Sequence, residues 1–73
     1  MVRYIITFEN TYRVIEAEKK LKGKFKKVTT IPTPEDLSTD CGVSLSLETN
    51  KNRQELADYL KDANITFSKI VKK

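Results

Sequence analysis

Alternation of apolar and polar residues predicts four strands along the chain. The segments are rich in β-branched and aromatic residues and are separated by turn-forming residues. We expect strands at Val2 to Phe8, Phe25 to Ile31, Val43 to Glu48 and Ile65 to Val71. Strict alternation in the third strand places Val43, Leu45 and Leu47 on one face, which we expect to point into the core.

The first strand carries apolar residues on both of its faces. Tyr4, Ile6 and Phe8 share one face, whereas Ile5 points the other way. Ile5 is therefore either covered on the second face of the sheet or exposed on an open side.

The second strand leads into a segment bounded by prolines. Pro32 and Pro34 are expected to end the strand, because proline has no N–H to donate to a neighbouring strand. The run Thr33 to Asp36 resembles the start of a short helix, with a capping threonine, a proline at the first position and two acids in the first turn. We expect this turn to stop near Asp40.

Helical spacing of apolar residues predicts a first helix from Tyr12 to Lys22. Asn10 or Thr11 is expected as the N-cap, because its side-chain oxygen can accept a hydrogen bond from a backbone amide of the first turn. Gly23 is expected at the C′ position with a positive φ. The stripe of residues on the helical repeat consists of Val14, Ile15, Ala17 and Leu21.

A second helix is predicted from Arg53 to Ala63. Asn52 and Glu55 have the spacing of a capping box at its start, and Asn64 suits the C′ position after its end. Its inward stripe is expected to consist of Leu56, Tyr59, Leu60 and Ala63.

The resulting order, β-α-β-β-α-β, predicts an α+β fold of the ferredoxin-like split βαβ type. This fold has a four-stranded antiparallel sheet with two helices on one face. A right-handed crossover makes the first two strands parallel, with the third strand between them in the opposite direction. We expect Phe8 to Thr11 and the turn at Asn64 to approach Cys41 at one end of the domain.

Length and composition favour a small folded protein. The 73 residues fit one domain, which we expect to span residues 1–73, and 38% hydrophobic with 33% charged residues suits a compact chain. No apolar run approaches the roughly 18 residues of a membrane span, and we expect no membrane partner. The single cysteine cannot form an internal disulfide, which favours a cytoplasmic protein.

The chain is basic, with a net charge of +4 and a pI of about 9.3. Many of its lysines cluster between Lys19 and Lys27. A nucleic-acid surface would also need stacking aromatics or a recognition helix, and neither stands out. We interpret the lysines as a solvated helix face, so nucleic-acid binding is disfavoured and remains a third alternative.

Residue types argue against several chemistries. The absence of histidine excludes a Cys–His nucleophile pair, and one cysteine without histidine cannot build an ordinary structural zinc site. There is no glycine-rich phosphate loop. Glu35, Asp36 and Asp40 are better explained as capping and turn residues than as an acid–base pair. We therefore expect no enzymatic activity, no metal and no cofactor.

Cys41 is the main candidate for chemistry. Its thiolate would be the reactive form, and an unperturbed cysteine has a pKa of about 8.5. Backbone amides and hydroxyl groups would favour the anion, whereas the carboxylate of Asp40 opposes it. The supporting groups expected near the thiol belong to Gly42, Ser38, Thr39, Asn10 and Thr11. The alternative is an inert, half-buried cysteine at the start of a strand.

Several short stretches have the pattern of a known family. They are a first strand ending in Phe8, then Asn10-Thr11, Glu16-Ala17-Glu18 with Leu21-Lys22, Ile31-Pro32-Thr33-Pro34, and Ser38 with Cys41-Gly42-Val43. These stretches resemble the selenium/sulfur (Se/S) carrier-like family, bacterial domains formerly of unknown function, over nearly the whole chain. Ile31 to Gly42 is the most specific part. Glu35 and Asp40 depart from the pattern, which commonly has a basic residue and a small hydroxyl residue there.

The resemblance implies a carrier without catalytic activity of its own. Cys41 would bind sulfur or selenium as a persulfide or selenopersulfide and pass it to a partner enzyme. The implied partners are a cysteine desulfurase or an enzyme of selenium metabolism. The alternative is a small ferredoxin-like binding or regulatory module in which Cys41 is incidental, and a homodimer remains open.

Overall fold

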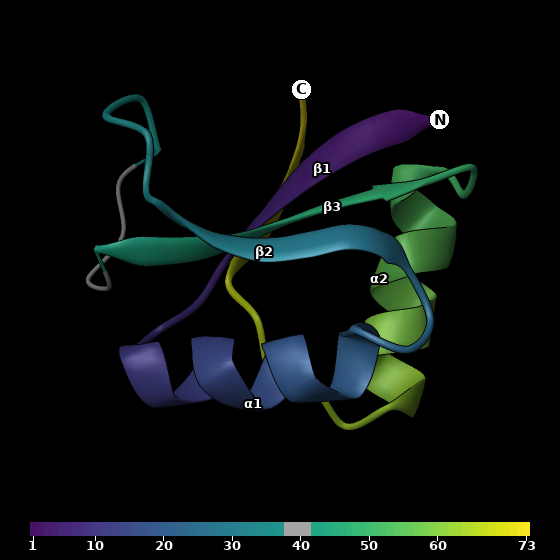
Figure 1. Cartoon of the computed structure of the whole chain (residues 1–73), viewed down its shortest axis with the longest axis horizontal. Helices are drawn as coiled ribbons and strands as arrows, with labels where there is room; N and C mark the ends of the chain where they lie inside the picture. The colour runs from purple at the N-terminus through teal and green to yellow at the C-terminus, as the bar shows by residue number, and fades with distance from the viewer. Residues whose placement is uncertain (38–41) are drawn as a thin grey trace.

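The computed structural model describes residues 1–37 and 42–73. Its elements follow the predicted order, and their bounds agree with the predicted ones within one residue except at the start of the last strand (Figure 1). They are β1 (Val2–Thr7), α1 (Thr11–Leu21), β2 (Lys26–Pro32), β3 (Val43–Thr49), α2 (Arg53–Asp62) and β4 (Lys69–Lys72).

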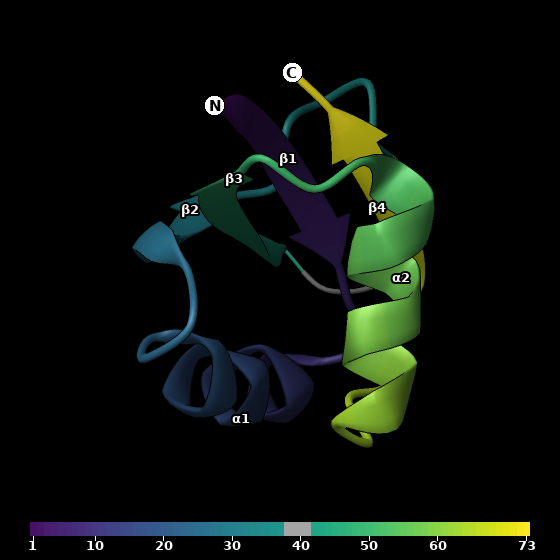
Figure 2. The same cartoon turned by 90° about the vertical axis from the view of Figure 1, so that its right-hand side faces the viewer.

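The four strands form one sheet in the order β2-β3-β1-β4, and each strand is antiparallel to its neighbours. β3 lies between β1 and β2, as predicted. Ile5 in the middle of β1 lies opposite Ser46 of β3 on one side and Val71 of β4 on the other. Both helices lie on the same side of the sheet, as Figures 1 and 2 show. The ferredoxin-like α+β fold is confirmed.

The main core lies between the sheet and the two helices. Its fully buried members include Ile6, Phe8, Val14, Leu21, Leu45, Leu47, Leu56 and Leu60. Ile15, which follows the same helical repeat in the sequence, is 47% exposed. It is rotated about 100° around α1 from Val14, so the narrower stripe of Val14, Ala17 and Leu21 packs inward and leaves Ile15 on the outer flank.

The middle of the second face of the sheet is also buried. Ile5 is only 3% exposed, and Ser44 and Ser46 beside it on this face are buried as well. The segment 33–37 lies on this side of the sheet, opposite the helices (Figures 1 and 2). Of the two outcomes left open for Ile5, the structure shows the covered one.

The helix starts follow the sequence closely. The Asn10 side chain caps α1 by accepting a hydrogen bond from the Arg13 amide at 3.0 Å. Asn52 and Glu55 form the predicted capping box of α2, with bonds of 2.8 and 3.3 Å. Each cap satisfies a backbone amide that has no partner within the helix.

The helix ends follow the sequence only in part. Asn64 has a φ of 59°, as expected at the C′ position of α2. Gly23 does not have a positive φ, so that prediction is wrong. The chain leaves α1 through right-handed backbone at Lys22, and the amides of Lys24 and Phe25 both donate to the Leu21 carbonyl.

β2 contains an irregularity that periodicity does not reveal. Lys27 has a φ of 54°, and the pairing register with β3 shifts between Lys26 and Thr29. The shift brings both Phe25 and Val28 to the core side, although strict alternation would place them on opposite faces. β2 is an edge strand, which tolerates a bulge and a proline as its last residue.

We expect Asn52→Ala to lower the free energy of unfolding by about 1 kcal/mol, because the Glu55 amide loses its acceptor. Urea denaturation of the two proteins measures the difference. Asn52→Ser keeps a capping oxygen and serves as the control, with a loss of only a few tenths. Equal losses in the two variants would contradict the assigned cap.

Candidate functional site

The predicted site lies where β2 ends and β3 begins. Of its residues, Gly42, Asn10 and Thr11 are described by the structure. Cys41, Ser38 and Thr39 lie outside the described residues, so their predicted roles stay predictions. The described residues show how Gly42, which is bonded to Cys41, is held.

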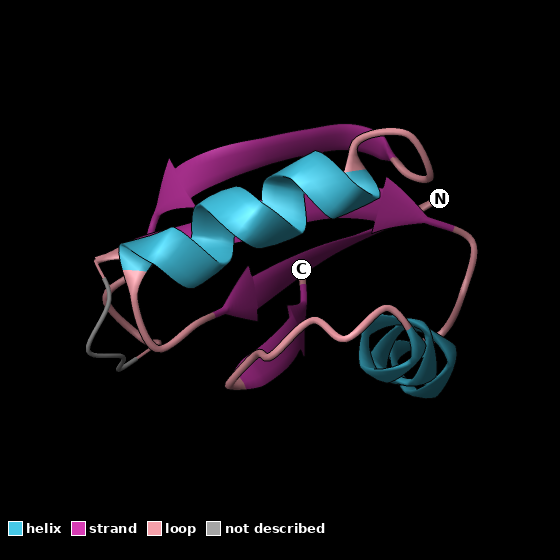
Figure 3. Ribbon diagram, turned by 90° about the horizontal axis from the view of Figure 1, so that it is seen from below, coloured by secondary structure: helices cyan, strands magenta, loops and turns pink. Residues whose placement is uncertain are grey.

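The sheet register brings the predicted elements to one end of the domain. Thr7, the last residue of β1, lies opposite Ser44 of β3. From there the chain enters α1 within four residues of Thr7. Figures 1 and 3 show the start of β3 and the start of α1 at the same end of the molecule. The prediction that the end of β1, the start of α1 and the start of β3 lie at one end is confirmed, whereas their approach to Cys41 stays a prediction.

The turn at Asn64 does not join this end. The Ala63 carbonyl accepts a hydrogen bond from Nζ of Lys20, in the last turn of α1, at 3.3 Å. The sequence that follows reaches the end of β1 instead, where the Ser68 amide donates to the Thr7 carbonyl at 2.7 Å. The expectation for Asn64 is wrong because β4 begins only at Lys69, four residues later than predicted.

The base of the segment that carries Cys41 is fixed by two hydrogen bonds beyond the β2–β3 ladder. The Thr33 amide donates to the Gly42 carbonyl at 3.0 Å. The hydroxyl groups of Thr33 and Ser44 lie 2.7 Å apart, and Ser44 is fully buried. Both ends of the segment 34–41 are therefore held by neighbouring strands, and Cys41 is one peptide bond from this anchored base.

The segment 34–37 forms a turn rather than the start of a helix. The Leu37 amide donates to the Pro34 carbonyl at 3.0 Å, which closes one turn. A single closed turn gains too little to nucleate a helix. Asp36 also contacts Lys73 at the C-terminal end, with 3.5 Å between Oδ2 and Nζ. This exposed pair contributes little stability.

A shallow groove of about 310 Å³ lies beside the anchored base. Its lining is mostly apolar and consists of Thr30, Ile31, Pro32, Gly42 and Val43. A Cβ atom added at Gly42 would meet no described atom within 4 Å. Among the described residues, none therefore blocks the position that a side chain at Gly42 would take.

The start of α1 presents a helix N-terminus at this end without acidic residues in its first turn. Asn10 Oδ1 accepts the Arg13 amide, and the Nδ2 group of the same side chain is its donor toward an anion. Within the described ranges, no group of three histidine, cysteine, aspartate or glutamate side chains could hold a metal ion.

The Thr33–Ser44 hydroxyl pair is a part of the site that sequence reasoning missed. Once Thr33 lies opposite Gly42, Ser44 is its diagonal neighbour on the next strand, and the two hydroxyl groups meet at 2.7 Å. The pair could have been found from the pairing register of β2 and β3. That register cannot be derived from the sequence unless the exact ends of both strands are known.

We expect Thr33→Val to destabilise the protein by about 1–3 kcal/mol, because the buried Ser44 hydroxyl loses this partner. The double variant Thr33→Val/Ser44→Ala should cost about 1 kcal/mol less than the sum of the single changes. Urea denaturation of all four proteins gives this coupling. Thr30→Val, at an exposed position of β2, is the control and should change little. Additive losses would contradict the pairing.

The described helices α1 and α2 are both too short and too polar to cross a membrane.

Comparisons with known proteins agree with the resemblance found in the sequence. The family profile described as "Putative Se/S carrier protein-like" matches residues 3–72. A curated "Putative sulfur carrier protein" of Aquifex aeolicus (strain VF5) is 34% identical over 71 residues, or 96% of this chain and 36% of the relative. The chain thus spans about a third of that relative's length. No solved structure matches significantly. The chain belongs to the Se/S carrier protein-like family.

Proposed function

We propose that the protein is a sulfur or selenium carrier that holds the chalcogen on Cys41 as a persulfide or selenopersulfide. One observation carries the proposal. This chain belongs to the Se/S carrier protein-like family, and its single thiol, that of Cys41, directly precedes Gly42. The name of the Aquifex relative points the same way. The protein itself would catalyse no reaction and would work in the cytoplasm, where a lone thiol stays reduced.

Loading is a thiol exchange between two proteins. The Cys41 thiolate attacks the terminal sulfur of a persulfide on a donor, most simply a cysteine desulfurase. The new S–S bond forms on Cys41 as the S–S bond of the donor breaks, and the donor leaves as a thiolate. A selenopersulfide forms by the same exchange with a donor from selenium metabolism. The reverse attack by an acceptor thiol removes the chalcogen.

The surroundings of Gly42 suit such an exchange. The hydrogen bonds of Thr33 fix Gly42, the residue bonded to Cys41, next to the start of β3, and no described atom lies within 4 Å of a Cβ atom added at Gly42. Gly42, Ser38, Thr39, Asn10 and Thr11 are the proposed supports of the anion, through backbone amides, hydroxyl groups and the start of α1.

We expect incubation with a cysteine desulfurase and L-cysteine to add one sulfur atom to the protein, as intact mass spectrometry detects. The gain should disappear in Cys41→Ser and should be reversed by a dithiol reductant. A reduced, fully alkylatable Cys41 that gains no sulfur would refute the carrier function. It would favour the alternative of a binding module with an incidental cysteine.

We expect Asp40→Asn to lower the apparent pKa of Cys41 and to raise its alkylation rate at neutral pH. The change removes a negative charge next to the thiolate, which is the reacting form. The pH dependence of iodoacetamide alkylation measures both quantities. Asp36→Asn is the matched control, because the Asp36 carboxylate pairs with Lys73. The same shift in both variants would show a general charge effect in place of a local one.

A further inference from the structure

The outer edge of β4 is the end of the sheet on the side of α2. The Lys73 amide donates to the Arg3 carbonyl at 2.8 Å, and Val71 lies opposite Ile5. Residues of an antiparallel strand alternate between bonding to one neighbour and facing the other side. The backbone N–H and C=O groups of Ile70 and Lys72 therefore point away from β1, toward the outer side of the strand, where no other strand of the described sheet lies.

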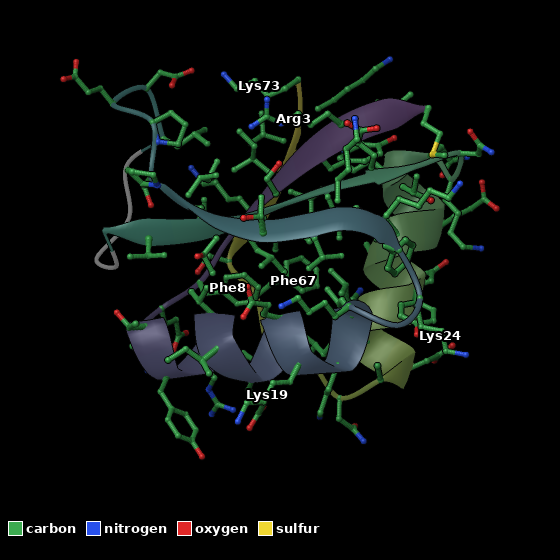
Figure 4. The ribbon with its side chains drawn as sticks, in the orientation of Figure 1. Arg3, Phe8, Lys19, Lys24, Phe67 and Lys73 are labelled. Atoms are coloured by element: carbon green, nitrogen blue, oxygen red, sulfur yellow. The ribbon has the colours of Figure 1, made fainter. Side chains whose placement is uncertain are left out.

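A groove of about 390 Å³ follows this edge. It is lined by Arg53, Gln54, Ala57, Phe67, Ser68, Lys69, Ile70 and Val71. Ala57 and Phe67 are half-buried and give the groove an apolar floor on the helix side, with Arg53 exposed at its rim. Val71 and the exposed Lys69 line it from the opposite face of the sheet, the face that holds Ile5. Figure 2 shows β4 beside α2, and Figure 4 shows Phe67 on the helix side of the sheet. Unpaired strand groups beside pockets for side chains are the features that bind an added strand.

The charge of the groove favours an acidic partner over a second copy of this chain. Its charged lining residues, Arg53 and Lys69, are both cationic, and Lys72 continues the positive charge along the strand. A second copy paired through β4 would bring the lysines of one strand against the same lysines of the other. Such like-charge contacts are destabilising, and lysines on an edge strand oppose self-pairing. A strand with carboxylates is favoured by the same charges.

We propose that the outer edge of β4 binds an extended acidic segment of a partner protein as a fifth strand. Its apolar side chains on the helix side pack on Ala57 and Phe67 beside Arg53, and its carboxylates on the other face contact Lys69. Lys69 lies opposite Thr7, and Thr7 lies opposite Ser44. The bound segment thus passes about 15 Å, or three strand spacings, from the start of β3. The inference does not depend on the chemistry of Cys41.

The test uses a synthetic peptide of alternating glutamate and valine, titrated into the full ¹⁵N-labelled chain. We expect its chemical-shift changes to concentrate at residues 67–72 and at Arg53. The amides of Ile70 and Lys72 should become protected from hydrogen exchange. A peptide with lysine in place of glutamate is the control and should bind at least tenfold more weakly. Equal binding of the two peptides, or changes centred elsewhere, would overturn the proposal.

Variants distinguish the contribution of charge to the affinity from that of backbone hydrogen bonds. Arg53→Glu/Lys69→Glu should weaken binding of the glutamate peptide about tenfold and restore binding of the lysine peptide. Lys72→Pro removes an outward N–H at an exposed edge position, where proline is tolerated, so it should weaken binding more than Lys72→Ala. Equal effects of these two variants, with the fold intact by circular dichroism, would exclude strand addition.

Two further measurements keep this inference distinct from the carrier function. Cys41→Ser should bind the glutamate peptide as the unchanged protein does, whatever the result of the sulfur-loading experiment. Sedimentation of the chain alone should show no self-association through the β4 edge. Lys72→Pro identifies this edge, because it would abolish any association that uses it. Such an association would mean that a second copy occupies the edge, and it would overturn the proposed acidic partner.

Discussion

The pairing of β1 with a strand on each side is the constraint on which the rest of the domain depends. Ile5 lies between Ser46 and Val71, and every residue from Tyr4 to Phe8 is buried. A strand enclosed in this way has one workable register, because a shift by one residue would exchange its two faces. This register brings the start of β3 and the start of α1 to the same end, where the segment with Cys41 is attached.

Features set by nearby residues could be predicted from the sequence. The caps at Asn10 and Asn52 depend on residues three positions away, and the alternation in β3 is visible within a few residues. The order of these elements then restricts the topology to the ferredoxin-like arrangement. The end of the domain that holds the candidate site follows from that topology, without knowledge of any contact.

Features set by distant residues could not be predicted. The positive φ of Lys27 is tolerated because its bulge brings both Phe25 and Val28 to the core, a gain that depends on the helices beneath. Ile15 is exposed because α1 turns its narrower stripe inward. The late start of β4 moves the Asn64 turn away from the site. The role of Cys41 itself stays a prediction from residue type and family.

The buried second face of the sheet links the candidate site to the stability of the whole domain. The segment 33–37 lies over the face that holds Ile5, and the same segment leads directly to the residues around Cys41. Displacing this segment would expose the half-buried Pro34 and Leu37 to water, at a cost that grows with the apolar area uncovered. A partner that reaches Cys41 without displacing the segment 33–37 avoids this cost, so the stability of the domain favours partners that bind the segment in its place on the sheet.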